Sequence, residues 1–208
     1  ANVTGLRANN GTVVVAADSI TDAGNSHADV AGLRALLLAT NGSIGASNPI
    51  DTELGTVGGF ASGGTIRLAE TAAGGNLTIG SIPEVFINAA QPITNVVVIY
   101  DDDADRVSSV SPQLAAINFS INAFATGLVA LGNGFIEVTT ADGDVIVDRP
   151  VAHAGNGYVQ LTANGADGDI VVIESVVSQA SFVRLNAQDD AVQNGAIISV
   201  NNGYVSVT

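Results

Sequence analysis

Apolar and polar residues alternate in four similar segments of the last third of the chain. In each segment an aromatic residue precedes two apolar residues that one polar residue separates, as in Phe135-Ile136-Glu137-Val138. The alternation places Ile136 and Val138 on one face of a strand and Glu137 on the other. The segments cover residues 134–139, 157–162, 181–186 and 203–208. Their aromatic positions, 135, 158, 182 and 204, recur with a period of about 23, which indicates a repeat.

A second apolar run lies between each pair of these segments. The runs cover residues 145–147, 170–173 and 196–200, and the loop sequence Ala-Asp-Gly-Asp recurs at 141–144 and 166–169. A period in the low twenties with two short strands per unit is typical of a solenoid coil. Because one coil cannot bury its apolar face alone, neighbouring coils are expected to stack at about 4.8 Å, the strand spacing of a sheet.

The first half of the chain shows the same pattern less regularly. Strands are predicted at residues 12–16, 36–39, 64–69 and 95–99, with a spacing of about thirty residues. Asn-Gly pairs separate many of the predicted strands, and both residue types tolerate the positive φ of a tight corner. The sequence therefore predicts an all-β fold: one parallel β-solenoid over residues 1–208 with coils of about 22–30 residues. Coils are looser over 1–100 and regular over 133–208, and 101–132 is an insertion or an irregular coil.

The composition agrees with a narrow core of stacked strands. Hydrophobic residues make up 47% of the chain, yet Met, Trp and Cys are absent and aromatic residues reach only 4%. The remaining Val, Ile, Leu and Ala are small or β-branched residues, which pack well on a pleated surface. The absence of Cys excludes disulfides and thiolate metal sites within the chain.

The charge is strongly negative. Twenty acidic residues face six arginines and no lysine, giving a formal net charge of −14. A chain of this charge repels phosphate backbones and anionic lipids, so neither a nucleic acid nor a membrane surface is expected as a partner. The sequence contains no run of eighteen apolar residues, so no membrane insertion is expected.

One acidic cluster has the chemistry of a calcium site. Asp101, Asp102, Asp103 and Asp105 can supply hard oxygen ligands, although the spacing of an EF-hand is absent. The alternative interpretation is a solvated acidic turn. The recurring loop acids are a second candidate: Asp142, Asp144, Asp167 and Asp169 would lie close together in stacked coils, where either a cation bridges them or they point into water.

Signals for catalysis are weak. Glu137 and Glu174 could act as acid and base across coils, but both occupy outward positions. His27 and His153 stand alone in predicted loops, and His153 is interpreted as a surface residue. We therefore predict no enzymatic activity, no catalytic residues and no cofactor apart from the calcium candidate.

Several short sequence segments in the first half of the chain resemble a known group of proteins. The stretches are residues 18–24, 42–52, 55–59 and 64–70. They resemble units of the giant repetitive exoproteins of planctomycetes and cyanobacteria, which are similar to filamentous haemagglutinin-like adhesins. The resemblance extends over most of the chain apart from 101–132. It implies a right-handed parallel β-helix, a secreted or cell-surface location and an adhesive or fibre-forming role, and it supplies no catalytic residues.

Two functions are therefore considered. The first is an extracellular structural or adhesive segment of a fibre or stalk. Both chain ends are interpreted as uncapped strands, so the expected partners are copies of the chain or flanking repeats of the same polypeptide, stacked end to end. The second is a carbohydrate-binding or carbohydrate-cleaving β-helix with surface glycans as partners. It requires a groove with exposed aromatic rings and converging carboxylates.

Overall fold

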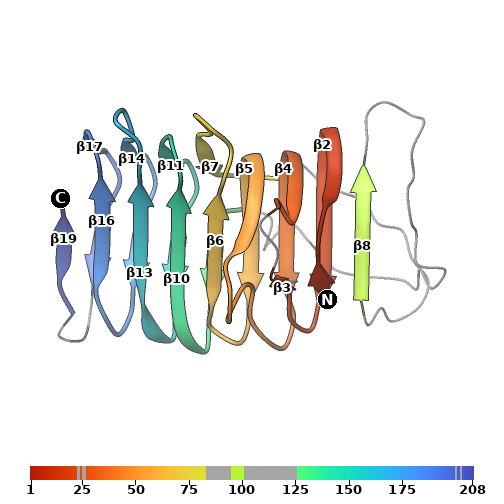
Figure 1. The fold of residues 1–208 in the computed structure, drawn as a ribbon. Coiled ribbons are helices and arrows are strands. Elements are labelled where there is room, and N and C mark those ends of the chain that lie inside the picture. The colour runs from red at the N-terminus through yellow and green to blue at the C-terminus, as the bar shows by residue number, and fades with distance from the viewer. Residues whose placement is uncertain (23, 25–26, 83–94, 101–125, 200, 202) are drawn as a thin grey trace.

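The computed structural model describes residues 1–208 except 23, 25–26, 83–94, 101–125, 200 and 202. The described residues form no helix, and parallel strands stack into a solenoid of about seven turns, which confirms the predicted fold class (Figure 1). No described segment is therefore a helix long and apolar enough to cross a membrane. The strands are β1 (Asn2–Val3), β2 (Leu6–Ala17), β3 (Thr21–Asp22), β4 (Val30–Ala39), β5 (Ile50–Ala61), β6 (Ile66–Glu70), β7 (Leu77–Ile79), β8 (Asn95–Tyr100), β9 (Leu128–Ala130), β10 (Asn133–Thr140), β11 (Val145–Val147), β12 (Val151–His153), β13 (Asn156–Ala163), β14 (Ile170–Val172), β15 (Val176–Ser178), β16 (Val183–Ala187), β17 (Ala191–Gln193), β18 (Ile197–Ser199) and β19 (Val205–Val207).

Each regular coil contains three strands. β10, β11 and β12 form one coil, β13, β14 and β15 form the next, and β16, β17 and β18 follow; each strand pairs in parallel with its counterpart one coil away. One column of paired residues runs through positions 20, 44, 66, 136, 159, 183 and 205. Its members recur about every 23 residues, apart from one long excursion between positions 66 and 136.

The coils of the first half contain few residues because single long strands continue through the corners without a separate loop. β5 is one strand of 12 residues, yet it pairs in turn with β6, β7 and β9, which lie on three different sides of the next coil. β2 and β4 are similarly long, with 12 and 10 residues. Because the column passes from Ile20 to Ile44 and then to Ile66, the coils of the first half are as short as the later ones. The spacing of about thirty that the sequence indicates for this half is therefore too long.

The excursion leaves the stack and returns to it at one corner. The Gly127 N–H donates to the Gly80 carbonyl at 3.0 Å, and Ser81 and Thr126 form an antiparallel bridge. Of the predicted irregular segment 101–132, residues 101–125 lie outside the described residues, and residues 128–130 form β9, which pairs with β5 and β12. β8 lies within the excursion and pairs antiparallel with residues 12–17 of β2, at the N-terminal end of the stack (Figure 1).

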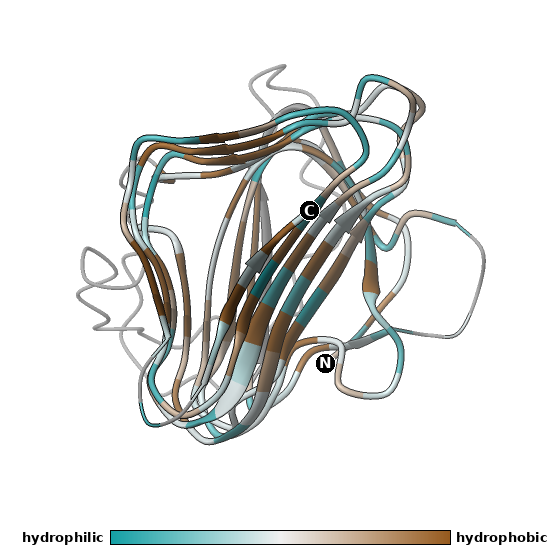
Figure 2. Cartoon of the chain, turned by 90° about the vertical axis from the view of Figure 1, so that its left-hand side faces the viewer, coloured by the Kyte–Doolittle hydropathy of each residue, from teal (hydrophilic) through white to brown (hydrophobic). Residues whose placement is uncertain are grey.

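A single apolar core runs along the axis of the solenoid. Seen along this axis, the coils lie over one another as closed outlines (Figure 2). The inward column is fully buried at Ile20, Ile66, Ile136 and Val183, whereas its last member, Val205, is 44% exposed. Buried and less buried residues alternate along the strands of the regular coils, such as β10 and β13, and these coils supply apolar cover for their neighbours.

Candidate functional site

The predicted calcium ligands Asp101, Asp102, Asp103 and Asp105 lie outside the described residues. Among the residues that are described, no group of three His, Asp or Glu side chains is placed to hold a metal ion.

The second acidic candidate forms a ladder of side chains and backbone amides. The Asn76 Oδ1 accepts the N–H of Asp144 at 2.9 Å, Asp144 Oδ1 accepts the N–H of Asp169 at 3.0 Å, and Asp169 Oδ1 accepts the N–H of Asp190 at 2.9 Å. Each side chain thus bonds the same position of the next coil. The carboxylates of Asp144 and Asp169 thus turn towards the backbone of the next coil rather than freely into water, and a cation bridging the loop acids stays a prediction. Asp142 is separate and accepts the N–H of Gly74 at 3.2 Å.

The repeated aromatic residues stack on the outside of the solenoid. The ring centroids of Phe135, Tyr158, Phe182 and Tyr204 are 5.1, 4.6 and 5.2 Å apart, with interplanar angles of 10–14°. Each inner ring therefore covers the faces of its neighbours and leaves its edge to solvent. Sugars stack on ring faces, and within this ladder the only faces not covered by another ring are the outer faces of the two end rings, Phe135 and Tyr204, of which Tyr204 is 50% exposed.

A polar column runs beside the aromatic ladder. The Arg67 Nε lies 2.9 Å from Glu137 Oε2, and the Tyr158 hydroxyl donates to Glu137 Oε1 at 2.5 Å. Arg184 donates to the Tyr204 hydroxyl at 2.8 Å. Burial raises the pKa of Tyr158 to about 12, and the bond to the Glu137 carboxylate adds to the rise because ionisation would place two negative charges together. Glu137 therefore serves a structural network, and the exposed Glu174 is not among its partners.

His153 is buried, so the prediction of a surface histidine is wrong. Its side chain is fully enclosed at the inward end of β12. The Gly64 carbonyl lies 2.9 Å from Nε2, and a carbonyl can only accept, so Nε2 carries the proton. Nδ1 has no hydrogen-bond partner. The ring fills a corner where Gly157 leaves space, because a Cβ at Gly157 would lie 2.6 Å from Nε2.

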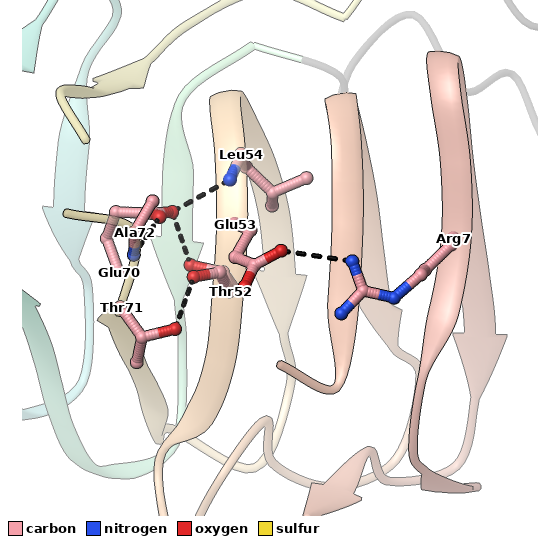
Figure 3. Close-up of polar contacts among 7 residues, drawn as sticks. All are labelled: Arg7, Thr52, Glu53, Leu54, Glu70, Thr71 and Ala72. Carbon is pink, nitrogen blue, oxygen red and sulfur yellow. Dashed lines mark hydrogen bonds and ion pairs between the residues drawn. The ribbon is translucent and has the colours of Figure 1, made fainter. Parts of the chain in front are cut away.

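The buried carboxylate of Glu70 stabilises the corner of β5 through hydrogen bonds (Figure 3). Its role was not predicted from the sequence. Glu70 is 1% exposed. Its Oε2 accepts the Thr52 hydroxyl at 2.9 Å and the Leu54 N–H at 2.8 Å, and its Oε1 accepts the Ala72 N–H at 3.1 Å. Burial raises the pKa of Glu70, while these three donors oppose the rise. Two of the donors belong to β5, and the third, the Ala72 N–H, belongs to the turn after β6.

Asp29 is a second buried acid, and it is less well satisfied. Its side chain is fully enclosed, Oδ2 accepts the Asp51 N–H at 3.1 Å, and Oδ1 has no partner. Burial raises the pKa of Asp29 to about 6, the Asp51 N–H opposes the rise, and the carboxylates of Asp22 and Asp51 add to it. The pKa of Asp51 is also raised, mainly by burial and in addition by the negative charge of Asp22. These acids tie together the first coils, since the Asp29 backbone bonds both Leu6 and Asp51.

A notch of about 200 Å³ opens where β2 and β4 slip in register after Ala8. Arg7 and Glu53 lie in register on either side of Ala31, whose small side chain lets them meet across β4 at 3.0 Å (Figure 3). Their side chains are 52% and 42% exposed, so this ion pair contributes little to stability. Gly32 completes the notch.

The C-terminal coil differs from every inner coil. The inward residues Val183 and Leu185 of β16 are buried, but their counterparts Val205 and Val207 of β19 are 44% and 46% exposed. At the other end of the stack, β8 pairs with residues 12–17 of β2, whereas the predicted end strand, β1, pairs with β3 and has no second strand partner among the described residues.

Comparisons of the chain with protein-family models, with curated proteins and with solved structures found no match.

Proposed function

We propose that the chain is a structural segment of an extracellular, cell-surface β-solenoid, in which it provides length and stiffness to a fibre or stalk. The observation that carries the proposal is the uninterrupted stack: the inward column, the aromatic ladder and the acidic ladder each continue from coil to coil in register. Such a fold is quasi-one-dimensional, because each coil contacts only its neighbours, and it resists bending through continuous hydrogen bonding.

A secreted location and an adhesive role for such a rod rest on the resemblance of residues 18–24, 42–52, 55–59 and 64–70 to repetitive exoproteins. The carbohydrate alternative has less support, since the stacked rings of the ladder cover one another's faces.

Immunogold electron microscopy tests the proposal. Antibodies raised against the purified chain are applied to intact cells of the source organism and to permeabilised cells. Label along surface fibres of intact cells, lost when the gene is deleted, supports the proposed function. Label that appears only after permeabilisation contradicts it.

A further inference from the structure

Tyrosine is the side chain of this protein that gives up one electron most readily. The other residue types that are easily oxidised, Trp, Cys and Met, are absent, and the chain has three tyrosines, Tyr100, Tyr158 and Tyr204. A one-electron oxidant that reaches the protein is therefore reduced by a tyrosine. The surroundings of Tyr158 and Tyr204 decide which of these two phenols reacts more easily.

The phenol of Tyr158 is bonded to a base. Its hydroxyl donates to Glu137 Oε1 at 2.5 Å, which is at the short end of the range for a hydroxyl and a carboxylate. The other oxygen of Glu137 lies 2.9 Å from Arg67 Nε, and this ion pair keeps Oε1 turned towards the phenol. A phenol that loses an electron becomes a strong acid. A carboxylate already in contact with it can take the proton in the same step.

At neutral pH the reaction of Tyr158 starts from the neutral phenol. Burial and the Glu137 carboxylate raise the pKa of Tyr158 to about 12, so the phenolate, which is oxidised without a proton transfer, is not populated. The proton must therefore leave together with the electron, and the group in place to receive it is Glu137.

Two phenylalanine rings enclose the ring of the half-buried Tyr158. The Phe135 ring lies on one face with the centroids 5.1 Å apart, and the Phe182 ring lies on the other face at 4.6 Å. Tyrosyl radicals are lost when two of them form a carbon–carbon bond, and that bond forms from the face of each ring. Because both faces of Tyr158 are covered, a radical on this ring is protected from coupling.

Tyr204 belongs to the same ladder but has a different polar partner. Its hydroxyl accepts a hydrogen bond from Arg184 at 2.8 Å, and no carboxylate of the described residues accepts its proton. Oxidation of Tyr204 must therefore release the proton to water or buffer. The guanidinium beside the phenol oxygen also opposes the loss of an electron, because that step makes the phenol positive.

We propose that Tyr158 is a redox-active tyrosine that reduces one-electron oxidants of the organic peroxyl radical class and passes its proton to Glu137. The phenolic O–H bond breaks, the proton binds Glu137 Oε1, and a neutral tyrosyl radical remains between the two rings. The peroxyl radical takes up the electron and a proton from water and becomes a hydroperoxide. Glu137 then returns its proton to water, so that one hydrogen atom has passed from Tyr158 to the oxidant. The inference goes beyond the proposed function, since it gives the outward face of the rod a chemical activity of its own.

Flash oxidation of single-tyrosine variants tests the proposal. Photogenerated tris(bipyridine)ruthenium(III) serves as the oxidant, and transient absorption follows the tyrosyl radical. Tyr100→Phe with Tyr204→Phe leaves Tyr158 alone, and Tyr100→Phe with Tyr158→Phe leaves Tyr204 alone. We expect the oxidation rate of Tyr158 to be independent of buffer concentration, because Glu137 takes the proton. The oxidation rate of Tyr204 should rise with buffer concentration.

Glu137→Gln in the variant that keeps only Tyr158 removes the base. The amide oxygen still accepts the phenol hydrogen bond but cannot take up the proton, so the oxidation rate should fall about 100-fold and become dependent on buffer concentration. The matched control Asp167→Asn makes the same change in net charge in an exposed loop and should keep the rate. Circular dichroism checks that each variant is folded.

An unchanged oxidation rate in Glu137→Gln would overturn the inference. The same holds if Tyr158 and Tyr204 depended equally on buffer concentration, a comparison that leaves Glu137 intact and does not rely on the folding of its variant. Neither result bears on the cell-surface labelling, so failure of the redox role and failure of the proposed function are separable.

Discussion

Replacement of Asp29 by Asn should stabilise the protein at neutral and alkaline pH. Asp29 is fully enclosed, and one of its oxygens has no hydrogen-bond partner. Burial raises its pKa from 3.8 to about 6. Because the pKa is higher in the folded state than in the unfolded state, the stability linked to this group is fully present below about pH 4. It is lost as the pH rises through about 6.

The size of the effect follows from the same shift. At about 1.4 kcal/mol for each pH unit, a rise from 3.8 to about 6 corresponds to about 3 kcal/mol of lost stability at pH 8. Partial hydration of the neighbouring carboxylates of Asp22 and Asp51 reduces this figure, so a gain of about 1–3 kcal/mol is expected for Asp29→Asn. The Asn carbonyl oxygen can still accept the Asp51 N–H, and the change removes the buried charge.

Urea titrations followed by circular dichroism between pH 4 and pH 8 measure this gain. The variant and the parent should agree near pH 4 and diverge as the pH rises, with the variant more stable at pH 8. Asp167→Asn in an exposed loop makes the same change in net charge and serves as the control. Equal stability of Asp29→Asn and the parent at pH 8, or curves that stay parallel over the whole range, would show that burial of this carboxylate carries no penalty.

Substitutions at three further positions test other parts of the stack by the same urea titrations. Asp169→Ala removes the acceptor for the Asp190 N–H and should cost about 1 kcal/mol, whereas Asp169→Asn keeps an acceptor and should be nearly neutral; equal losses would contradict the ladder. Glu70→Ala leaves three donors without their acceptor and should cost about 3 kcal/mol or more; a loss below about 1 kcal/mol would contradict its role at the corner. Gly157→Ala would place Cβ 1.9 Å from the Gly134 carbonyl and against the ring of His153, so a loss of about 3 kcal/mol is expected; an unchanged midpoint would contradict this packing.

The sequence was most informative where each coil repeats the same outward side chain. The aromatic positions 135, 158, 182 and 204 stack directly, so their spacing equals the coil length. In the first half no such marker recurs, and β2, β4 and β5 bend round corners without a break in hydrophobicity. The predicted strand at 95–99 is present as β8, but only the structure shows that it pairs antiparallel with β2, since strand direction is not encoded in a local pattern.

The buried polar residues could not be predicted for a related reason. His153 ends a strand of three residues, Val-Ala-His, and three residues are too few to display alternation. Glu70 ends a strand and Asp29 directly precedes one, which are common places for exposed acids, and their burial depends on which backbone N–H groups of a neighbouring corner need an acceptor. The loop acids Asp144 and Asp169 were correctly placed close together, but their partner is the backbone of the next coil, which residue types alone do not reveal.

The acidic ladder shows how an acidic solenoid can stack carboxylates in register from coil to coil. Two carboxylates about 4.8 Å apart in water repel each other by about 0.9 kcal/mol. A hydrogen bond from a backbone amide to a carboxylate contributes about 1.5–3 kcal/mol, so the bonds that Asp144 and Asp169 accept outweigh this repulsion. Asn76 makes the same bond with no charge, which means that the charge itself is not required for stacking. Its effect is instead on the outside of the rod, where a net charge of −14 opposes side-by-side contact between copies.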